Sequence, residues 1–216
     1  MIEAIIFDMD GTLVDTEPFN TEIEKRQFKL NNIDISEEEH LKYLGVASDE
    51  MWKEIAERHN LRIPVVELIE QNHIESLRYF TEIESIPVMT GLVDLLEKLQ
   101  VKNYPMAVAS SSAPEIIDLI LNKTNLKMYF QVIVSAEQAG KSKPEPDVFL
   151  LAAEKLGIKP ANCMVVEDSE NGIKAAIAAG MTCVAYQGSE ADPQKQKEAD
   201  AVILSYAQLE RIINES

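Results

Sequence analysis

Short apolar runs alternate with helical patterns along most of this chain, and that alternation restricts the fold more than any other feature. The runs AIIF, MAVAS, VIVS, CMVVED and TCVAY occupy residues 4–7, 106–110, 132–135, 163–168 and 182–186, with a shorter run at 201–203. Helical patterns lie at residues 91–101, 114–124, 145–156, 170–179 and 206–214. Alternating strands and helices form βαβ units, and continuously apolar strands belong to buried parallel sheets. The sequence therefore predicts an α/β fold with helices on both faces of a parallel sheet.

Residues 16–86 have a different character, because no strand-like run follows Val14 in this region. Amphipathic helical patterns replace it, at residues 18–31, 36–43, 47–58 and 64–82. We interpret this region as a small helical domain inserted after the first strand. The chain would then form a core domain from residues 1–15 and 87–216 and a helical domain from 16–86, with a hinge where the two connections cross.

Charge and composition exclude several classes of partner. The 216 residues carry 20 basic and 37 acidic side chains, a net charge of −17, and such a surface repels nucleic acid. No apolar run approaches the roughly 20 residues of a membrane span, and the acidic N-terminus is unlike a signal peptide. The two cysteines, Cys163 and Cys183, show no metal-ligand spacing and are typical of reduced core thiols. We expect a cytoplasmic protein without nucleic-acid or membrane partners, and a monomer.

Polar side chains follow four of the predicted strands. Asp8 and Asp10 come after the first strand, Ser110 begins a serine triplet at the end of the second, Lys143 follows the third, and the pair at 167–168 (Glu-Asp) ends the fourth. Ligands of open α/β sheets bind outside the carboxyl ends of the strands. The sequence therefore predicts one site at this edge.

Each of these features has a simpler interpretation on its own. DMDG resembles the start of a calcium loop, but position twelve of that loop would be Phe19 instead of a glutamate. AGKS resembles part of a phosphate loop, but Ser135 stands where the first glycine belongs. The serine triplet alone would be a helix cap, and Lys143 alone a surface lysine. Four such features at four strand ends favour a joint function.

The chemistry that unites them is phosphoryl transfer through an aspartate. Asp8 would attack phosphorus, since a carboxylate is a competent nucleophile, and Asp8 with Asp168 would hold Mg²⁺. Lys143 would neutralise phosphate charge, and Ser110 with the backbone N–H groups after it would bind phosphate oxygens. Asp10 would protonate the leaving oxygen and then deprotonate the attacking water.

Four motifs carry a resemblance that covers the whole chain. DMDGTLVD, VASSS, KSKPEPDVF and VVEDSENGIKAA resemble the motifs of the haloacid dehalogenase-like superfamily. The resemblance implies a Rossmann-like core, Mg²⁺, an aspartyl-phosphate intermediate and a helical cap after the first motif. It implies the following roles: catalysis by Asp8, Asp10, Ser110 and Lys143; phosphate binding by Gly11, Thr12, Ser110, Ser111 and Lys143; and metal binding by Asp8, the Asp10 carbonyl, Asp168 and Glu167, the last directly or through water.

Two subgroups of this superfamily compete for the function. The cap placement resembles β-phosphoglucomutase, which interconverts β-glucose 1-phosphate and glucose 6-phosphate. That subgroup carries a histidine where this chain has Asn20, and a Lys-Asn pair where it has Ala113 and Pro114. DTEPF and SSSAPE resemble sugar-phosphate phosphatases instead. We expect a phosphatase of small phosphorylated metabolites, with the phosphomutase as the alternative. An aspartate phosphoreceiver is a third possibility, but such a domain would be half as long and lack a cap.

Substrate choice would depend on the cap and on the turn that enters it. Candidate contacts to the substrate are Glu17, Asn20, Gly45, Ser48, Trp52 and Arg78. Trp52 has an alternative role in the core of the helical domain, because Met51 and Ile55 share its helical spacing.

Overall fold

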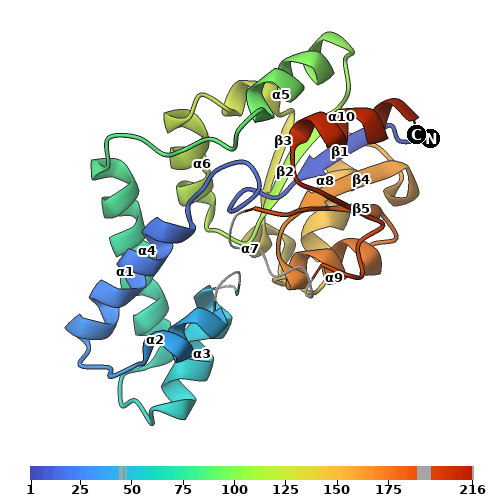
Figure 1. Cartoon of the computed structure of the whole chain (residues 1–216). Coiled ribbons are helices and arrows are strands. Elements are labelled where there is room, and N and C mark those ends of the chain that lie inside the picture. The colour runs from blue at the N-terminus through green and yellow to red at the C-terminus, as the bar shows by residue number, and fades with distance from the viewer. Residues whose placement is uncertain (44–45, 47, 189–195, 216) are drawn as a thin grey trace. The chain divides into compact units, whose positions relative to one another are not determined.

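The computed structural model describes residues 1–43, 46, 48–188 and 196–215. The chain forms two compact units (Figure 1). One, the core unit, consists of Met1–Asp15 and Ser85–Ser216, and the other, the helical unit, of Thr16–Glu84. In the described part of the chain, no helix is long and apolar enough to cross a membrane.

The core unit contains a six-stranded sheet in which all neighbouring strands are parallel. The spatial order is β3-β2-β1-β4-β5-β6. The strands are β1 (Ala4–Phe7), β2 (Met106–Ser110), β3 (Val132–Ser135), β4 (Cys163–Glu167), β5 (Thr182–Tyr186) and β6 (Ala201–Ile203). The predicted α/β class is confirmed. β4 ends one residue earlier than predicted, so Asp168 lies in the following loop.

Helices pack on the sheet because its strands are apolar on both sides. The core helices are α5 (Leu92–Val101), α6 (Pro114–Lys123), α7 (Ala136–Ala139), α8 (Asp147–Leu156), α9 (Glu170–Ala178) and α10 (Tyr206–Glu215), with 3₁₀ turns η2 (Lys127–Tyr129) and η3 (Pro160–Asn162). Ile6 and Ala107 share one buried cluster with Phe149 of α8 and Ile173 of α9. Successive strand residues point to opposite faces, so Phe7 faces the other layer, where α5 and α10 lie (Figure 1).

The helical unit has its own apolar core. Its elements are α1 (Glu17–Leu30), α2 (Glu37–His40), η1 (Leu41–Tyr43), α3 (Ser48–Arg58) and α4 (Val65–Glu82). Trp52 is fully buried and packs edge-on against Phe28, with ring centroids 5.3 Å apart. Met51, Ile55 and Leu68 belong to the same cluster. The amphipathic pattern of this segment therefore serves to bury one face of each helix.

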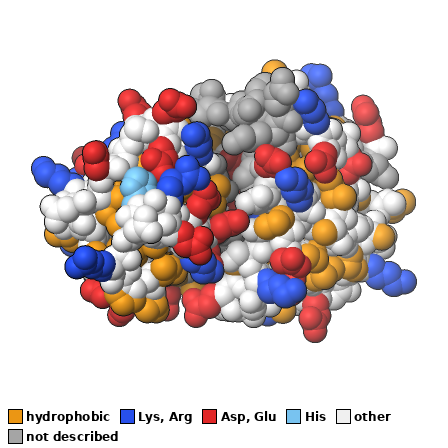
Figure 2. All heavy atoms as spheres, turned by 90° about the horizontal axis from the view of Figure 1, so that it is seen from below, with side chains coloured by type: hydrophobic (Ala, Val, Ile, Leu, Met, Phe, Trp, Pro, Cys, Tyr) orange, Lys and Arg blue, Asp and Glu red, His pale blue; other side chains and the backbone are white. Residues whose placement is uncertain are grey.

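The surface reflects the strongly acidic composition. Figure 2 shows Asp and Glu side chains spread over the face in view, with Lys and Arg side chains scattered between them and not gathered into one basic patch. The face in view therefore offers no concentrated positive field to a phosphate backbone. Local positive charge is therefore needed wherever a small anion binds.

Candidate active site

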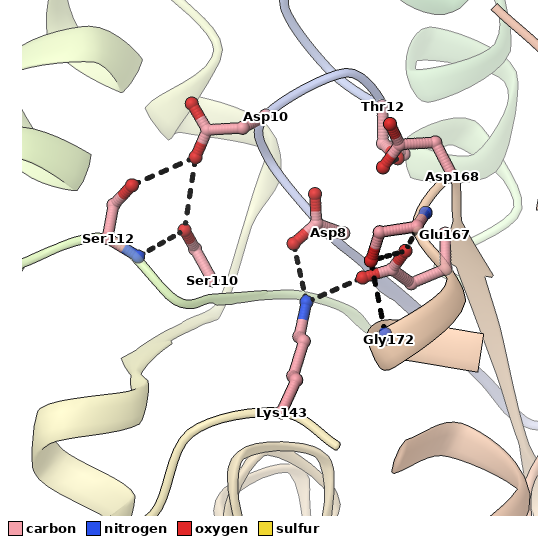
Figure 3. A network of polar contacts seen from close by, with 10 residues as sticks. Asp8, Asp10, Thr12, Ser110, Ser112, Lys143, Glu167, Asp168 and Gly172 are labelled. Carbon is pink, nitrogen blue, oxygen red and sulfur yellow. Dashed lines mark hydrogen bonds and ion pairs between the residues drawn. The ribbon is translucent and has the colours of Figure 1, made fainter. Parts of the chain in front are cut away.

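The strand ends of the core unit bring the predicted polar side chains together (Figure 3). Asp8 directly follows β1, Ser110 is the last residue of β2, and Glu167 is the last residue of β4. Because β1 lies between β2 and β4, the loop that carries Asp8 and Asp10 lies at the centre of this edge. Lys143 reaches it from the segment between α7 and α8.

Lys143 is buried between two carboxylates. Its Nζ donates to Asp8 Oδ1 at 2.5 Å and to Glu167 Oε1 at 2.8 Å, and it lies 4.8 Å from the centre of the Phe149 ring. Burial alone would lower the pKa of the Lys143 ammonium, but the charges of Asp8 and Glu167 outweigh this and raise it. The two carboxylates therefore favour the positively charged form of Lys143.

The carboxyl group of Asp8 is in an unusual environment. Burial raises its pKa well above the ordinary value, Lys143 opposes this, and the charges of Glu167 and Asp10 add to the increase. One ammonium thus faces an excess of negative charge. A group of this kind is suited to bind a further cation, because the added charge would stabilise the ionised carboxylates.

Asp8, Glu167 and Asp168 form a candidate metal centre. Each offers a carboxylate oxygen, and these oxygens lie within 4.8 Å of one another. Hard carboxylate donors suit Mg²⁺, whose ligands stand about 2.1 Å from the ion, so that opposite ligands are about 4.2 Å apart. The donor set therefore fits a magnesium ion after small side-chain movements.

Two glycines allow these carboxylates to approach the backbone. A Cβ on Gly11, which has φ of +75°, would lie 2.2 Å from Asp168 Oδ2, and a Cβ on Gly172 would lie 1.7 Å from Glu167 Oε1. Only hydrogen fits at either position. Gly172 was not predicted from the sequence as a site residue, and its place in the motif VVEDSENGIKAA gave the only signal.

Gly11 and Thr12 form hydrogen bonds within the loop and to Asp168. The Gly11 N–H donates to the Val14 carbonyl at 2.8 Å, and the Thr12 N–H to the Met9 carbonyl at 3.3 Å. The Thr12 hydroxyl donates to Asp168 Oδ1 at 3.5 Å. These two backbone N–H groups therefore close the loop itself, and the phosphate-binding role of Gly11 and Thr12 stays a prediction.

Asp10 is held apart from Asp8 by serine hydroxyl groups (Figure 3). Its Oδ2 accepts hydrogen bonds from Ser112 Oγ at 2.9 Å and from Ser110 Oγ at 3.5 Å. Ser110 Oγ also accepts from the Ser112 N–H at 3.0 Å. Ser111, predicted to bind phosphate, is exposed on the same loop. Ser112 was missed as a site residue, although it belongs to the same serine triplet.

The predicted substrate contacts lie in the helical unit and are not brought together in the same way. Glu17 and Asn20 are half-buried in the first turn of α1, and Ser48 Oγ accepts from Asn72 Nδ2 at 2.8 Å. Arg78 is exposed and donates two hydrogen bonds to Glu75. Gly45 lies outside the described residues.

Trp52 requires a correction as a substrate contact. Its side chain is fully buried in the core of the helical unit, so it has no face available to stack on a sugar. The alternative role in that core is the one that the structure shows.

Comparison with known proteins gives a consistent family. The family model described as "Haloacid dehalogenase-like hydrolase" matches residues 5–186. The chain is 32% identical over 180 residues to "Phosphorylated carbohydrates phosphatase" of Thermotoga maritima, covering 83% of this chain and 82% of that protein. It is 31% identical over 183 residues to "Fructose-1-phosphate phosphatase YqaB" of Escherichia coli, covering 84% and 94%. Among solved structures, the β-phosphoglucomutase of Clostridium difficile matches with a TM-score of 0.85 and 27% identity, covering 100% and 98%.

Proposed function

The chain belongs to the haloacid dehalogenase-like hydrolase family, and from this we propose that it is a Mg²⁺-dependent phosphatase of small phosphorylated metabolites, above all sugar phosphates. The main support is the separation of two carboxylates on one loop. Asp8 is buried beside Lys143, whereas Asp10 is bonded to Ser112. A nucleophile and an acid/base catalyst require different environments of this kind.

The proposed reaction begins with attack by a carboxylate oxygen of Asp8 on phosphorus. The bond from phosphorus to the leaving oxygen breaks, and Asp10 donates a proton to that oxygen. Water then attacks the phosphorus of the aspartyl phosphate, and Asp10 accepts a proton from it. Inorganic phosphate leaves, and the Asp8 carboxylate is restored.

The remaining residues would bind charge. Asp8, Glu167, Asp168 and the Asp10 carbonyl would hold Mg²⁺, which when bound offsets the repulsion between carboxylates and phosphate. Lys143 would bind a phosphate oxygen as a fixed positive charge, and its raised pKa supports this role. Ser110 would donate to another phosphate oxygen, since its hydroxyl already lies beside Asp10.

The substrate class is proposed from relatives and from the proposed cap. The two relatives named above are phosphatases of phosphorylated carbohydrates and of fructose 1-phosphate by their names. The helical unit would act as a cap that contributes substrate contacts, with Glu17, Asn20 and Ser48 as candidates. The proposal includes a cytoplasmic location, for which the buried free thiols of Cys163 and Cys183 are the support.

A phosphomutase is the second candidate, and the structural likeness to a β-phosphoglucomutase favours it. Asn20, Ala113 and Pro114 stand against it, because they replace the histidine and the Lys-Asn pair that the mutase pattern carries. Incubation with β-glucose 1-phosphate and catalytic bisphosphate separates the two functions. Glucose 6-phosphate would indicate the mutase, and free glucose with phosphate the phosphatase.

The nucleophile is tested by Asp8→Asn, which keeps the shape of the side chain and removes its charge. Release of phosphate from p-nitrophenyl phosphate with Mg²⁺ should fall to the background rate, because an amide does not form the covalent intermediate. Asp94→Asn, an exposed position in the first turn of α5, is the matched control and should retain full activity. Activity in Asp8→Asn would refute the assignment. A panel of sugar phosphates then identifies the substrate.

A further inference from the structure

Two neutral side chains from the C-terminal part of the chain support the backbone behind the proposed metal ligands. Gln196 Nε2 donates to the carbonyl oxygens of Asp168 at 2.9 Å and Tyr186 at 3.0 Å. The Tyr206 hydroxyl donates to the carbonyl oxygen of Thr12. Both side chains are 1% exposed, so these bonds are shielded from water.

The loop that carries Asp168 and the loop that carries Thr12 are also in contact with each other. Gly11 lies so close to Asp168 that no Cβ fits between them, and the Thr12 hydroxyl donates to the Asp168 carboxylate. The Tyr206 ring stacks on Tyr186 with centroids 4.9 Å apart and an angle of 14° between the planes. A displacement of the Thr12 or the Asp168 carbonyl group would therefore move the Asp168 carboxylate.

The chemistry of the two donors suits a place behind a cation. A lysine or arginine there would bind the same carbonyl oxygens, but its charge would repel a divalent ion. Burial raises the pKa of Tyr206 well above its ordinary value, so its hydroxyl remains a neutral donor. For Gln196, only the amide nitrogen can bond two carbonyl oxygens, and its Oε1 is buried without a hydrogen-bond partner among the described residues.

We propose that Gln196 and Tyr206 are positioning residues that set the affinity of the site for its divalent cation by holding the backbone of Asp168 and Thr12. Neither side chain would touch the phosphate or the ion. Their effect on the reaction would therefore come through metal binding and would be overcome at high Mg²⁺ concentration. The inference rests on the magnesium site of the proposed function.

The test measures Mg²⁺ binding directly, by titration calorimetry of metal-free protein at a temperature where every variant is folded. Tyr206→Phe keeps the ring and its stacking and removes the hydroxyl, and Gln196→Met keeps the length and removes the amide. We expect each to raise the dissociation constant for Mg²⁺ about tenfold, as is typical when groups that orient metal ligands are removed. The kcat at saturating Mg²⁺ should stay near the wild-type value.

Tyr129→Phe is the matched control, because Tyr129 is a buried tyrosine of η2, which precedes β3, the strand at the opposite edge of the sheet from β6. It should bind Mg²⁺ as the wild type does. Melting temperatures in EDTA distinguish an effect on metal binding from an effect on the stability of the fold alone. If both site variants melt earlier but bind Mg²⁺ with unchanged affinity, the proposal is wrong. If folded wild-type protein binds no Mg²⁺, the metal site itself is wrong, and this inference falls with it.

Discussion

Replacing Gly172 by alanine tests how closely the backbone of α9 approaches the Glu167 carboxylate. The new Cβ would stand 1.7 Å from Glu167 Oε1 and 1.9 Å from its Cδ. These separations are far below any van der Waals contact, so the Glu167 side chain or the helix has to move. The same substitution in an unobstructed helix would stabilise the protein by about 0.5–1 kcal/mol.

The expected loss follows from the bonds that Glu167 makes. Its carboxylate accepts from Lys143 Nζ at 2.8 Å, from the Ser169 N–H at 2.6 Å and from Ser169 Oγ at 2.9 Å. Hydrogen bonds to charged groups contribute about 1.5–3 kcal/mol each, and overpacking costs about 1–3 kcal/mol. With one of these bonds lost and the helix gain subtracted, we expect the free energy of unfolding to fall by about 1.5–5.5 kcal/mol. For a chain of this size, each kcal/mol lowers the melting temperature by about 2–4 °C.

A double-mutant cycle with Glu167→Ala isolates the contact. Unfolding by urea in EDTA gives the free energy of each of the four proteins. In the Glu167→Ala background the obstruction is absent, so Gly172→Ala should stabilise the protein by about 0.5–1 kcal/mol, the ordinary helix effect. An equal loss in both backgrounds would refute the reasoning, because it would place the strain elsewhere.

Two further results follow from the carboxylates on the first loop. Ser112→Ala should lower kcat about tenfold for a sugar phosphate and less for p-nitrophenyl phosphate. The sugar phosphate has the poorer leaving group, so only its reaction needs the proton of Asp10. Equal losses for both substrates would contradict this. In EDTA, the free energy of unfolding of the wild-type protein should fall relative to that of Asp8→Asn as the pH rises from about 4, because the raised pKa of Asp8 favours the protonated form in the folded state. Urea unfolding across this pH range measures the difference, and a constant difference would contradict the prediction.

The sheet could be predicted because each strand is a continuous apolar run. AIIF and MAVAS became β1 and β2 at the predicted bounds. Such runs can be recognised as buried strands from the sequence alone, because burial on both faces of a sheet leaves no place for polar residues. The four-residue helix α7 was missed because it depends on one local interaction, a capping box in which Ser135 and Gln138 bond each other's backbone. Two residues give too little pattern to predict a helix.

The candidate site was predictable only for side chains that carry charge or hydroxyl groups. Asp8 stands out in the sequence because a buried-looking segment ends in an ionisable residue, and Lys143 because it follows another of the predicted strands. Gly172, Gln196 and Tyr206 give no such signal, because they act through shape or through backbone carbonyl groups. Tyr206 and Thr12 are also 194 positions apart, so only the folded chain brings them together.

The register of the sheet explains why negative charge gathers at this edge. Phe7 of β1 is level with Val166 of β4, so the next residues, Asp8 and Glu167, are carried forward side by side. Two buried carboxylates at that spacing repel each other, and parallel pairing fixes their backbones in place. Lys143 lies between them and compensates only part of their charge, since Asp168 adds a third carboxylate nearby. The parallel pairing that fixes these backbones therefore creates a site with a remaining negative charge, which a magnesium ion would offset.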